Sequence, residues 1–221
     1  MTDSPYTLAR IRLFKGLSPQ VLATLGANLV ERRYSEGQII FVEDEPNAPV
    51  FFVVEGQVQV SRSCPEGREQ TMMRIGPGEA FYLPCAFASS HEAPATSVAL
   101  GEVCLLAVAP DAFRRITAET PALALAVLGD LSDKLRHMVC LARDLSLRSV
   151  RARLAQFLLE ESARRQGDTI RWTHAQIAAR IGSVREVVGR LLRELIAEGL
   201  ISMQRQRILV LDREGLRQRS E

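Results

Sequence analysis

The sequence has no segment of the kind that crosses a membrane or directs export. Its longest apolar runs are short, for example Val103–Ala109, whereas a membrane helix needs about 20 apolar residues. The amino-terminal residues Met1–Tyr6 contain no basic stretch followed by an apolar one, which is the pattern of an export signal. These absences predict a cytoplasmic protein with no membrane partner.

Cysteine is scarce, and common motifs of catalysis are absent. The cysteines lie far apart and form no Cys-x-x-Cys pair, which argues against a zinc finger or a thioredoxin-type site. They are Cys64, Cys85, Cys104 and Cys140. No Ser/His/Asp set, pair of carboxylates or phosphate-binding loop stands out. We therefore expect no metal site and no enzyme.

Lysine is almost missing, since only Lys15 and Lys134 accompany 26 arginines. Genome composition is a sufficient reason for this preference. The formal net charge of +2 is unevenly spread, however: residues 1–150 carry 14 basic and 17 acidic side chains, and residues 151–221 carry 14 basic and 9 acidic ones. A basic carboxyl-terminal third on an acidic body predicts a nucleic-acid-binding module. A length of 221 residues allows one large domain or two modest ones.

Short runs of strand-forming residues alternate with glycine-containing turns in the first half of the chain. The predicted strands are Gln38–Val42, Val50–Val54, Gln57–Ser61, Gln70–Ile75, Ser97–Leu100 and Val103–Val108. This spacing is typical of an all-β sandwich or barrel such as a jelly roll. Because helices are predicted on either side of these strands, we expect an α+β chain whose residues 1–119 form a β-roll domain with short flanking helices.

A long helix is predicted over residues 120–147, because Thr120-Pro121 supplies a cap and a proline at the first helical position. Its apolar positions repeat at spacings of 3, 4, 3, 4 and 3, as in the a/d seam of a coiled coil. They are Leu128, Leu131, Leu135, Met138, Ala142 and Leu145. The alternative is a stripe that packs on the β domain. Charged residues flank the seam, so we expect the dimerisation helix of a homodimer.

Residues 148–221 are predicted to form a compact module that begins with a helix at Ser149–Gln166. Thr173-x-x-Gln176 is a capping box that begins a second helix. Gly182 breaks that helix, and Ser183-x-x-Glu186 reads as a capping box for a third, which runs to about Ala197. Two helices joined by a short turn around glycine are the helix-turn-helix pattern.

The last predicted helix carries the residue types that read DNA bases. In this motif the second helix enters the major groove, where Arg can donate two hydrogen bonds to guanine and Glu can accept one from cytosine. Arg185, Glu186 and Arg190 share an exposed side with Gly189, which keeps that side flat. The alternative is that Glu186 serves only the capping box and the arginines lie on a solvated face.

A β-hairpin wing is predicted from Ile201–Arg205 and Arg207–Leu211, with Arg205 and Arg207 near phosphate. The full set of candidate DNA-binding residues is Thr173, His174, Gln176, Arg180, Ser183, Val184, Arg185, Glu186, Gly189, Arg190, Arg205 and Arg207.

With these motifs, residues 8–215 resemble the family of the cyclic-AMP receptor protein and the fumarate–nitrate reduction regulator. The most specific part of the resemblance is the helix-turn-helix segment Ile177–Arg190, in which Arg-Glu-x-x-Gly-Arg at residues 185–190 matches the cyclic-AMP-receptor version of the recognition helix. The resemblance implies a β-roll sensor domain, a dimerisation helix and a winged helix-turn-helix. It also implies a palindromic site with half-sites close to TGTGA, in which Arg185 and Arg190 read guanines and Glu186 reads a cytosine.

The sensor domain departs from its cyclic-nucleotide-binding relatives. Where they have Gly-Glu-Leu, with the Glu on the ribose, this chain has Tyr82-Leu83-Pro84, and the position of their phosphate-binding Arg falls on Ala95. A buried phosphate without a cation is costly, so we expect no cyclic AMP binding by the usual mode. The candidate effector pocket comprises Phe81, Tyr82, Leu83, Cys85, Ala95 and Thr96.

The sequence has no clear ligands for the other cofactors that members of this family bind. Relatives with an iron–sulfur cluster place several cysteines before the β-roll, but none precedes Cys64 here. The cysteine and histidine of a CO-sensing haem relative fall on Tyr82 and Pro84. His91 and His137 are isolated, so no haem ligand is assigned, and haem stays an open alternative.

A thiol switch is a further alternative. Cys64 lies between Arg62 and Arg68, which would favour its thiolate, and Cys85 lies in the candidate pocket. Inert thiols are the simpler interpretation.

The sequence therefore predicts a homodimeric transcription regulator that binds double-stranded DNA, with RNA polymerase as a further partner. It is controlled by an effector other than cyclic AMP or is active without ligand. Activation and repression are both open. The alternative is a ligand-binding β-roll that regulates a protein partner through its carboxyl-terminal domain.

Overall fold

The structure is a computed structural model that describes residues 8–65, 68–89, 91–164, 169–170, 172–204 and 207–220. Its contacts define two compact units, one of residues 1–62 with 73–137 and one of residues 63–72 with 138–221. The division falls inside the long helix, and the domain limits at residues 119 and 147 stay predictions. Arg205 and the predicted turn residues Glu66 and Gly67 lie outside the described residues.

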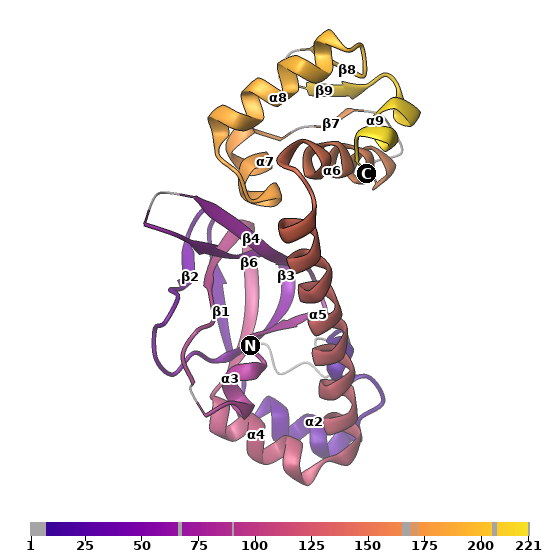
Figure 1. Cartoon of the computed structure of the whole chain (residues 1–221). Helices are drawn as coiled ribbons and strands as arrows, with labels where there is room; N and C mark the ends of the chain where they lie inside the picture. Colours follow the sequence, from indigo (N-terminus) through magenta and orange to yellow (C-terminus); the bar gives the residue numbers. More distant parts are fainter. Residues whose placement is uncertain are drawn as a thin grey trace. The chain divides into compact units, whose positions relative to one another are not determined.

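The β-roll is a six-stranded antiparallel sheet with short helices around it (Figure 1). The elements up to the long helix are η1 (Arg12–Phe14), α2 (Pro19–Gly26), β1 (Val30–Tyr34), β2 (Ile39–Phe41), β3 (Val50–Ser63), β4 (Glu69–Ile75), β5 (Ala80–Phe81), α3 (Pro84–Phe87), β6 (Thr96–Val108) and α4 (Pro110–Glu119). The strand order is β1-β6-β3-β4, while β2 also pairs with β6 and β5 with β3. The predicted fold class is confirmed.

Two pairs of predicted strands are single long strands. In β3 the pairing register shifts between Val53 and Glu55 and again between Glu55 and Gln57. Gly56 has a φ of 82° there, and a Cβ atom at this position would clash with the Glu102 carbonyl oxygen. Glycine thus produces a bulge in a continuing strand instead of a chain reversal.

Two apolar clusters fill the first unit. One lies under the helices and contains Phe14, Phe52, Phe113 and Leu123. The other lies inside the β-roll and contains residues from β3, β5 and β6. Strand alternation explains the division, because Phe51 and Phe52 are adjacent in β3 and point to opposite clusters.

The long helix α5 (Pro121–Leu147) uses an inner face to pack on the first of these clusters. Leu123 and Val127 are buried there, and Leu131 packs against the same cluster. Lys134 donates a hydrogen bond of 2.8 Å to the Ala80 carbonyl oxygen and also pairs with Asp130.

The second unit contains the predicted winged helix-turn-helix. Its elements are α6 (Val150–Arg164), β7 (Thr169–Ile170), α7 (His174–Ile181), α8 (Arg185–Ala197), β8 (Ile201–Gln204), β9 (Arg207–Val210) and α9 (Arg213–Arg219). The hairpin of β8 and β9 pairs with β7 to form a small antiparallel sheet (Figure 1). One apolar cluster joins α6, α7, α8, the hairpin and α9. The sequence did not predict β7 or α9.

None of the helices in the described part of the chain is both long enough and apolar enough to span a membrane.

Candidate nucleic-acid interface

The predicted capping box at the start of α7 is confirmed. The Thr173 hydroxyl oxygen accepts a hydrogen bond of 3.1 Å from the Gln176 backbone N–H, and the Gln176 side-chain oxygen accepts one of 2.9 Å from the Thr173 N–H. Two backbone donors that the helix leaves unpaired are satisfied in this way. Because its side-chain oxygen is used in the box, the group that Gln176 can offer to a further partner is its side-chain NH₂.

The turn between the two helices is also as predicted. Gly182 ends α7 in the left-handed conformation with a φ of 64°, and its N–H donates to the Ala178 carbonyl oxygen. Ser183 N–H donates to the same carbonyl at 2.9 Å. Such a cap favours glycine, because a Cβ atom is strained at positive φ.

The predicted second capping box is wrong. The N-cap of α8 is Val184, which has extended backbone angles and makes no side-chain capping hydrogen bond. Ser183 is buried and lies one residue too early to cap this helix. Glu186 therefore does not act as the partner of a serine cap, and it lies exposed in the first turn of α8.

The amino-terminal half of α8 presents an exposed polar face. Arg185, Glu186 and Arg190 are exposed, and Arg190 forms a long ion pair with Glu194, with its Nε 3.9 Å from the Glu194 carboxylate. The opposite face is anchored, because the buried side chains of α8 pack in the cluster of the second unit; they are Val188, Leu191, Leu192 and Leu195. A rigidly held helix with exposed arginines on its outer side can place them against base edges.

Gly189 lies beside His174 of α7. A Cβ atom at Gly189 would be 3.5 Å from the nearest His174 ring nitrogen, which is an ordinary contact. The fold therefore tolerates a larger residue here. Since glycine has no side chain, nothing projects from the outer face of α8 at this position.

The carboxyl-terminal end of α8 is braced by a charged network that the sequence did not reveal. Arg151 of α6 pairs with Glu194 at 3.7 Å and forms a hydrogen bond with Glu198. Arg219 of α9 donates to Glu198 at 3.1 Å. These two hydrogen bonds hold the pKa of Glu198 below its usual value.

The other candidate DNA-binding residues differ in how far they are exposed to solvent. Thr173 and Arg207 are exposed, whereas His174 and Val184 are half-buried. Arg180 instead lines a cavity of about 80 Å³ together with Asp144, Arg148, Arg153 and other residues of α5, α6 and α7. This placement gives no support to Arg180 as a phosphate contact.

The outer face of α5 carries a row of exposed apolar side chains. Leu125, Leu128, Leu135 and Val139 are all more than half exposed, and Ala142 continues the row. When Ser132 is counted between Leu128 and Leu135, successive members of this row lie 3, 4, 3, 4 and 3 residues apart in the sequence. Leu131 and Met138 of the predicted seam are half-buried, and Leu131 faces the protein core. Leu131 therefore lies on the inner face of α5, while the exposed row passes through Ser132.

Comparisons with known proteins identify both units. The model of the cyclic nucleotide-binding domain matches residues 31–120, and that of the Crp-like helix-turn-helix domain matches residues 152–219. The chain is 30% identical to a CRP-like cAMP-activated global transcriptional regulator of Mycobacterium tuberculosis, over 96% of this chain and 98% of that protein. The chain belongs to the CRP/FNR family of transcription regulators.

Other relatives agree with this membership. The cyclic AMP receptor protein of Thermus thermophilus is 28% identical, with 86% of this chain and 88% of that protein covered. The solved structure of a CRP/FNR-family regulator from Eubacterium rectale has the same fold, with a TM-score of 0.80, 24% identity and 100% and 99% of the two chains covered.

The β-roll interior of this CRP/FNR-family regulator is filled by aromatic rings. Phe51 and Phe81 stack with their ring centroids 4.9 Å apart, and the ring of Tyr82 contacts Phe81 edge to face at 5.0 Å. Phe41 packs against Phe51 and Tyr82 from β2. These aromatic residues belong to the apolar cluster inside the β-roll.

Tyr82 is held in this interior although its backbone is strained. Its φ is 60°, an uncommon conformation for a bulky residue, and the residue is only 4% exposed. The hydroxyl donates to the Ala95 carbonyl oxygen, and burial raises the pKa of Tyr82 to about 12. The phenol therefore stays neutral at physiological pH.

The structure brings only part of the candidate effector pocket together. Phe81, Tyr82, Cys85 and Ala95 belong to the β-roll cluster, whereas Leu83 packs in the other cluster of the first unit. Thr96 is half-buried, and its hydroxyl accepts a hydrogen bond of 3.0 Å from the Glu43 N–H.

The two candidate switch cysteines lie in different surroundings. Cys85 is buried, and burial raises its pKa to about 11. Arg62, which was expected to act on Cys64, is engaged by the carboxylate of Glu43.

Proposed function

We propose that this chain is a homodimeric regulator that recognises a palindrome with TGTGA-like half-sites through α8. The observation that carries the proposal is the exposed face of Arg185, Glu186 and Arg190 on a helix whose opposite face is buried. Arg185 and Arg190 would donate to guanine O6 and N7, and Glu186 would accept from cytosine N4. Thr173, Gln176 and Arg207 are proposed to contact phosphate or sugar.

The dimer is proposed to form through the exposed apolar row of α5. A soluble protomer gains nothing by exposing four large apolar side chains at coiled-coil spacing, and a second copy of the same helix would bury them. Two protomers would then present two α8 helices to half-sites one DNA turn apart. Family membership supports RNA polymerase as a further partner.

Single base substitutions in the DNA test whether the exposed face of α8 contacts the bases. We expect Arg190→Ala to lower affinity for the palindrome by about 1–3 kcal/mol and to lose discrimination at one guanine position only. Fluorescence anisotropy with duplexes that carry single substitutions measures this directly. An equal loss on every duplex would show that Arg190 contacts phosphate, and an unchanged affinity would remove it from the interface.

We further propose that DNA binding does not depend on cyclic AMP. Support comes from the aromatic cluster around Phe51, Phe81 and Tyr82, and from Leu83 and Ala95 at the positions where family members hold the ribose and the phosphate. Calorimetry should detect no binding of cyclic AMP to the wild-type protein. Micromolar binding that also raises DNA affinity would contradict this part of the proposal.

A further inference from the structure

One side chain, Arg153, lies where two helices of the second unit end. The helix α5 ends at Leu147 and α7 at Ile181, and the last carbonyl groups of a helix have no partner within it. Arg153 Nε donates to the Ile181 carbonyl oxygen at 2.8 Å, and Nη1 donates to the Arg148 carbonyl oxygen at 2.7 Å. Longer contacts of 3.4 and 3.5 Å reach the carbonyl oxygens of Leu145 and Gly182. A single guanidinium thus caps both helix ends.

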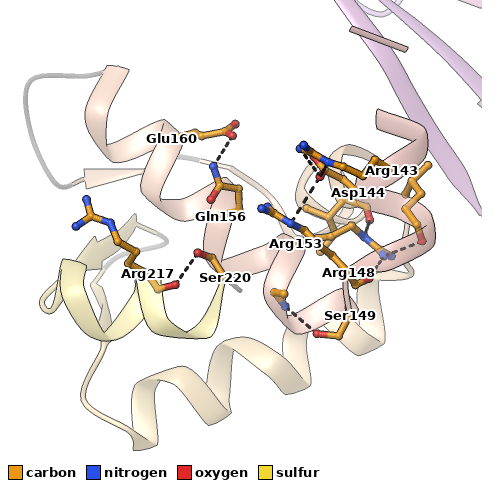
Figure 2. A network of polar contacts seen from close by, with 12 residues as sticks. Arg143, Asp144, Arg148, Ser149, Arg153, Gln156, Glu160, Arg217 and Ser220 are labelled. Carbon is orange, nitrogen blue, oxygen red and sulfur yellow. Dashed lines mark hydrogen bonds and ion pairs between the residues drawn. The ribbon is translucent and has the colours of Figure 1, made fainter. Parts of the chain in front are cut away.

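The electrostatics of this site suit a cation. The carboxyl-terminal end of a helix carries partial negative charge, and here two such ends meet at one guanidinium. Figure 2 shows Arg153 beside Asp144, Arg148 and Ser149 at the bend between α5 and α6. Burial lowers the pKa of Arg153, whereas the charge of Asp144 raises it. Because arginine stays charged in proteins, the backbone carbonyls replace the water that this cation has lost.

A pocket of about 80 Å³ that opens to solvent lies beside Arg153, between α5, α6 and α7. Arg153 is part of its wall with Leu145, Phe157 and Ile181. The hydrogen bonds of Arg153 therefore add to the apolar contacts among these three helices. The bend itself contains only Arg148 and Ser149 between α5 and α6.

We propose that Arg153 is a positioning residue for DNA recognition. It ties the Ile181–Gly182 turn to the end of α5, and α8 begins only three residues after Gly182. A shift of this turn would therefore move Arg185 and Glu186 at the start of the recognition helix. The inference rests on the proposed function of α8. Only arginine fits the role, because its planar fork can donate to both helix ends at once, whereas the single ammonium of lysine cannot.

Arg153→Gln and Arg153→Lys test this inference, with Arg151→Gln as the matched control. Arg151 lies on the same helix and makes ion pairs with Glu194 and Glu198, but it touches neither helix end. Hydrogen exchange of the Gly182 and Ser183 amides reports the turn without DNA. Both Arg153 variants should exchange these amides about tenfold faster, which corresponds to about 1.4 kcal/mol, whereas Arg151→Gln should not.

The DNA readout is the ratio of affinities for the palindrome and for a scrambled duplex, measured below the melting temperature of every variant. We expect this ratio to fall about tenfold in both Arg153 variants and to stay unchanged in Arg217→Gln, because the exposed Arg217 pairs only with Glu214 of its own helix α9 among the ion pairs of the described residues. Wild-type exchange rates in Arg153→Gln would overturn the inference, and so would full rescue by lysine. If the wild type shows no sequence preference, the proposed function fails instead, and the exchange rates still decide the role of Arg153.

Discussion

At the residue scale, Gly189 is a position where the fold accepts a larger residue but the proposed approach to DNA does not. Glycine within a helix costs stability, yet the space beside Gly189 accepts a methyl group at ordinary contact distance from His174. Packing therefore does not require glycine here, and we infer that Gly189 serves the proposed close approach of α8 to a DNA groove.

Gly189→Ala should accordingly raise stability and weaken DNA binding. We expect the free energy of unfolding to rise by about 0.5–1 kcal/mol and the affinity for the palindrome to fall about tenfold. Denaturant titration and fluorescence anisotropy measure the two effects. Gly129→Ala in α5, where an added Cβ meets nothing within 4 Å, should give the stability gain alone. Unchanged DNA affinity in Gly189→Ala would show that this face does not approach the groove.

The reactivity of Cys85 gives a second prediction at this scale. With a pKa of about 11, its thiolate amounts to roughly a thousandth of the thiol at pH 8, and its side chain is buried. The exposed Cys140 should therefore react with iodoacetamide much faster than Cys85 in the folded protein. Mass spectrometry of the alkylated peptides checks this, and denaturant should remove the difference. Rapid labelling of Cys85 at pH 8 in the folded state would contradict this prediction and would support the hypothesis that Cys85 acts as a thiol switch.

At the scale of the element, α5 has two apolar faces with different roles. Leu123, Val127 and Leu131 pack on the core of their own protomer, while Leu135 and Val139 are 66% and 61% exposed. A helix that serves one domain only needs one apolar face. The outer face is what the proposed dimer would bury.

Val139→Glu and Cys140→Glu form a matched pair that tests this assignment. Both residues are exposed and adjacent in α5, but only Val139 belongs to the apolar row. Val139→Glu should dissociate the dimer, because it places two carboxylates in the seam. Sedimentation velocity should find Cys140→Glu still dimeric. If both variants keep the dimer, the interface lies elsewhere.

At the scale of the whole molecule, the uneven charge has consequences for affinity. Residues 151–221 contain five more basic than acidic side chains, and all of the basic ones are arginine. If a dimer makes about 6–10 phosphate contacts, DNA affinity should fall by about 10³–10⁵ between 50 and 200 mM salt. Titrations at a series of salt concentrations measure the slope. A flat salt dependence would favour the alternative in which the carboxyl-terminal domain binds a protein partner.

The sequence predicted the elements whose signals are local. Thr173 and Gln176 lie at capping-box spacing, and Gly182 ends the helix they begin, so the first half of the helix-turn-helix could be inferred from neighbouring residues. Ser183 has the same local pattern, but the chain stays extended through Val184, and the helix starts one residue later than predicted.

Features that depend on distant contacts could not be predicted from the sequence. The bulge at Gly56 needs the neighbouring strand at Glu102, and the inner position of Leu131 needs the core of the β-roll. Arg153 has no sequence signal at all, since its partners are backbone carbonyl groups at Leu145–Arg148 and Ile181–Gly182.

Selection from random double-stranded DNA by the purified protein, with no ligand added, tests sequence recognition by α8. We expect enrichment of two inverted TGTGA-like half-sites about 10–10.5 base pairs apart, and the loss of that pattern with Arg185→Ala or Arg190→Ala. Enrichment of no sequence without ligand, followed by enrichment when cyclic AMP is added, would contradict this expectation.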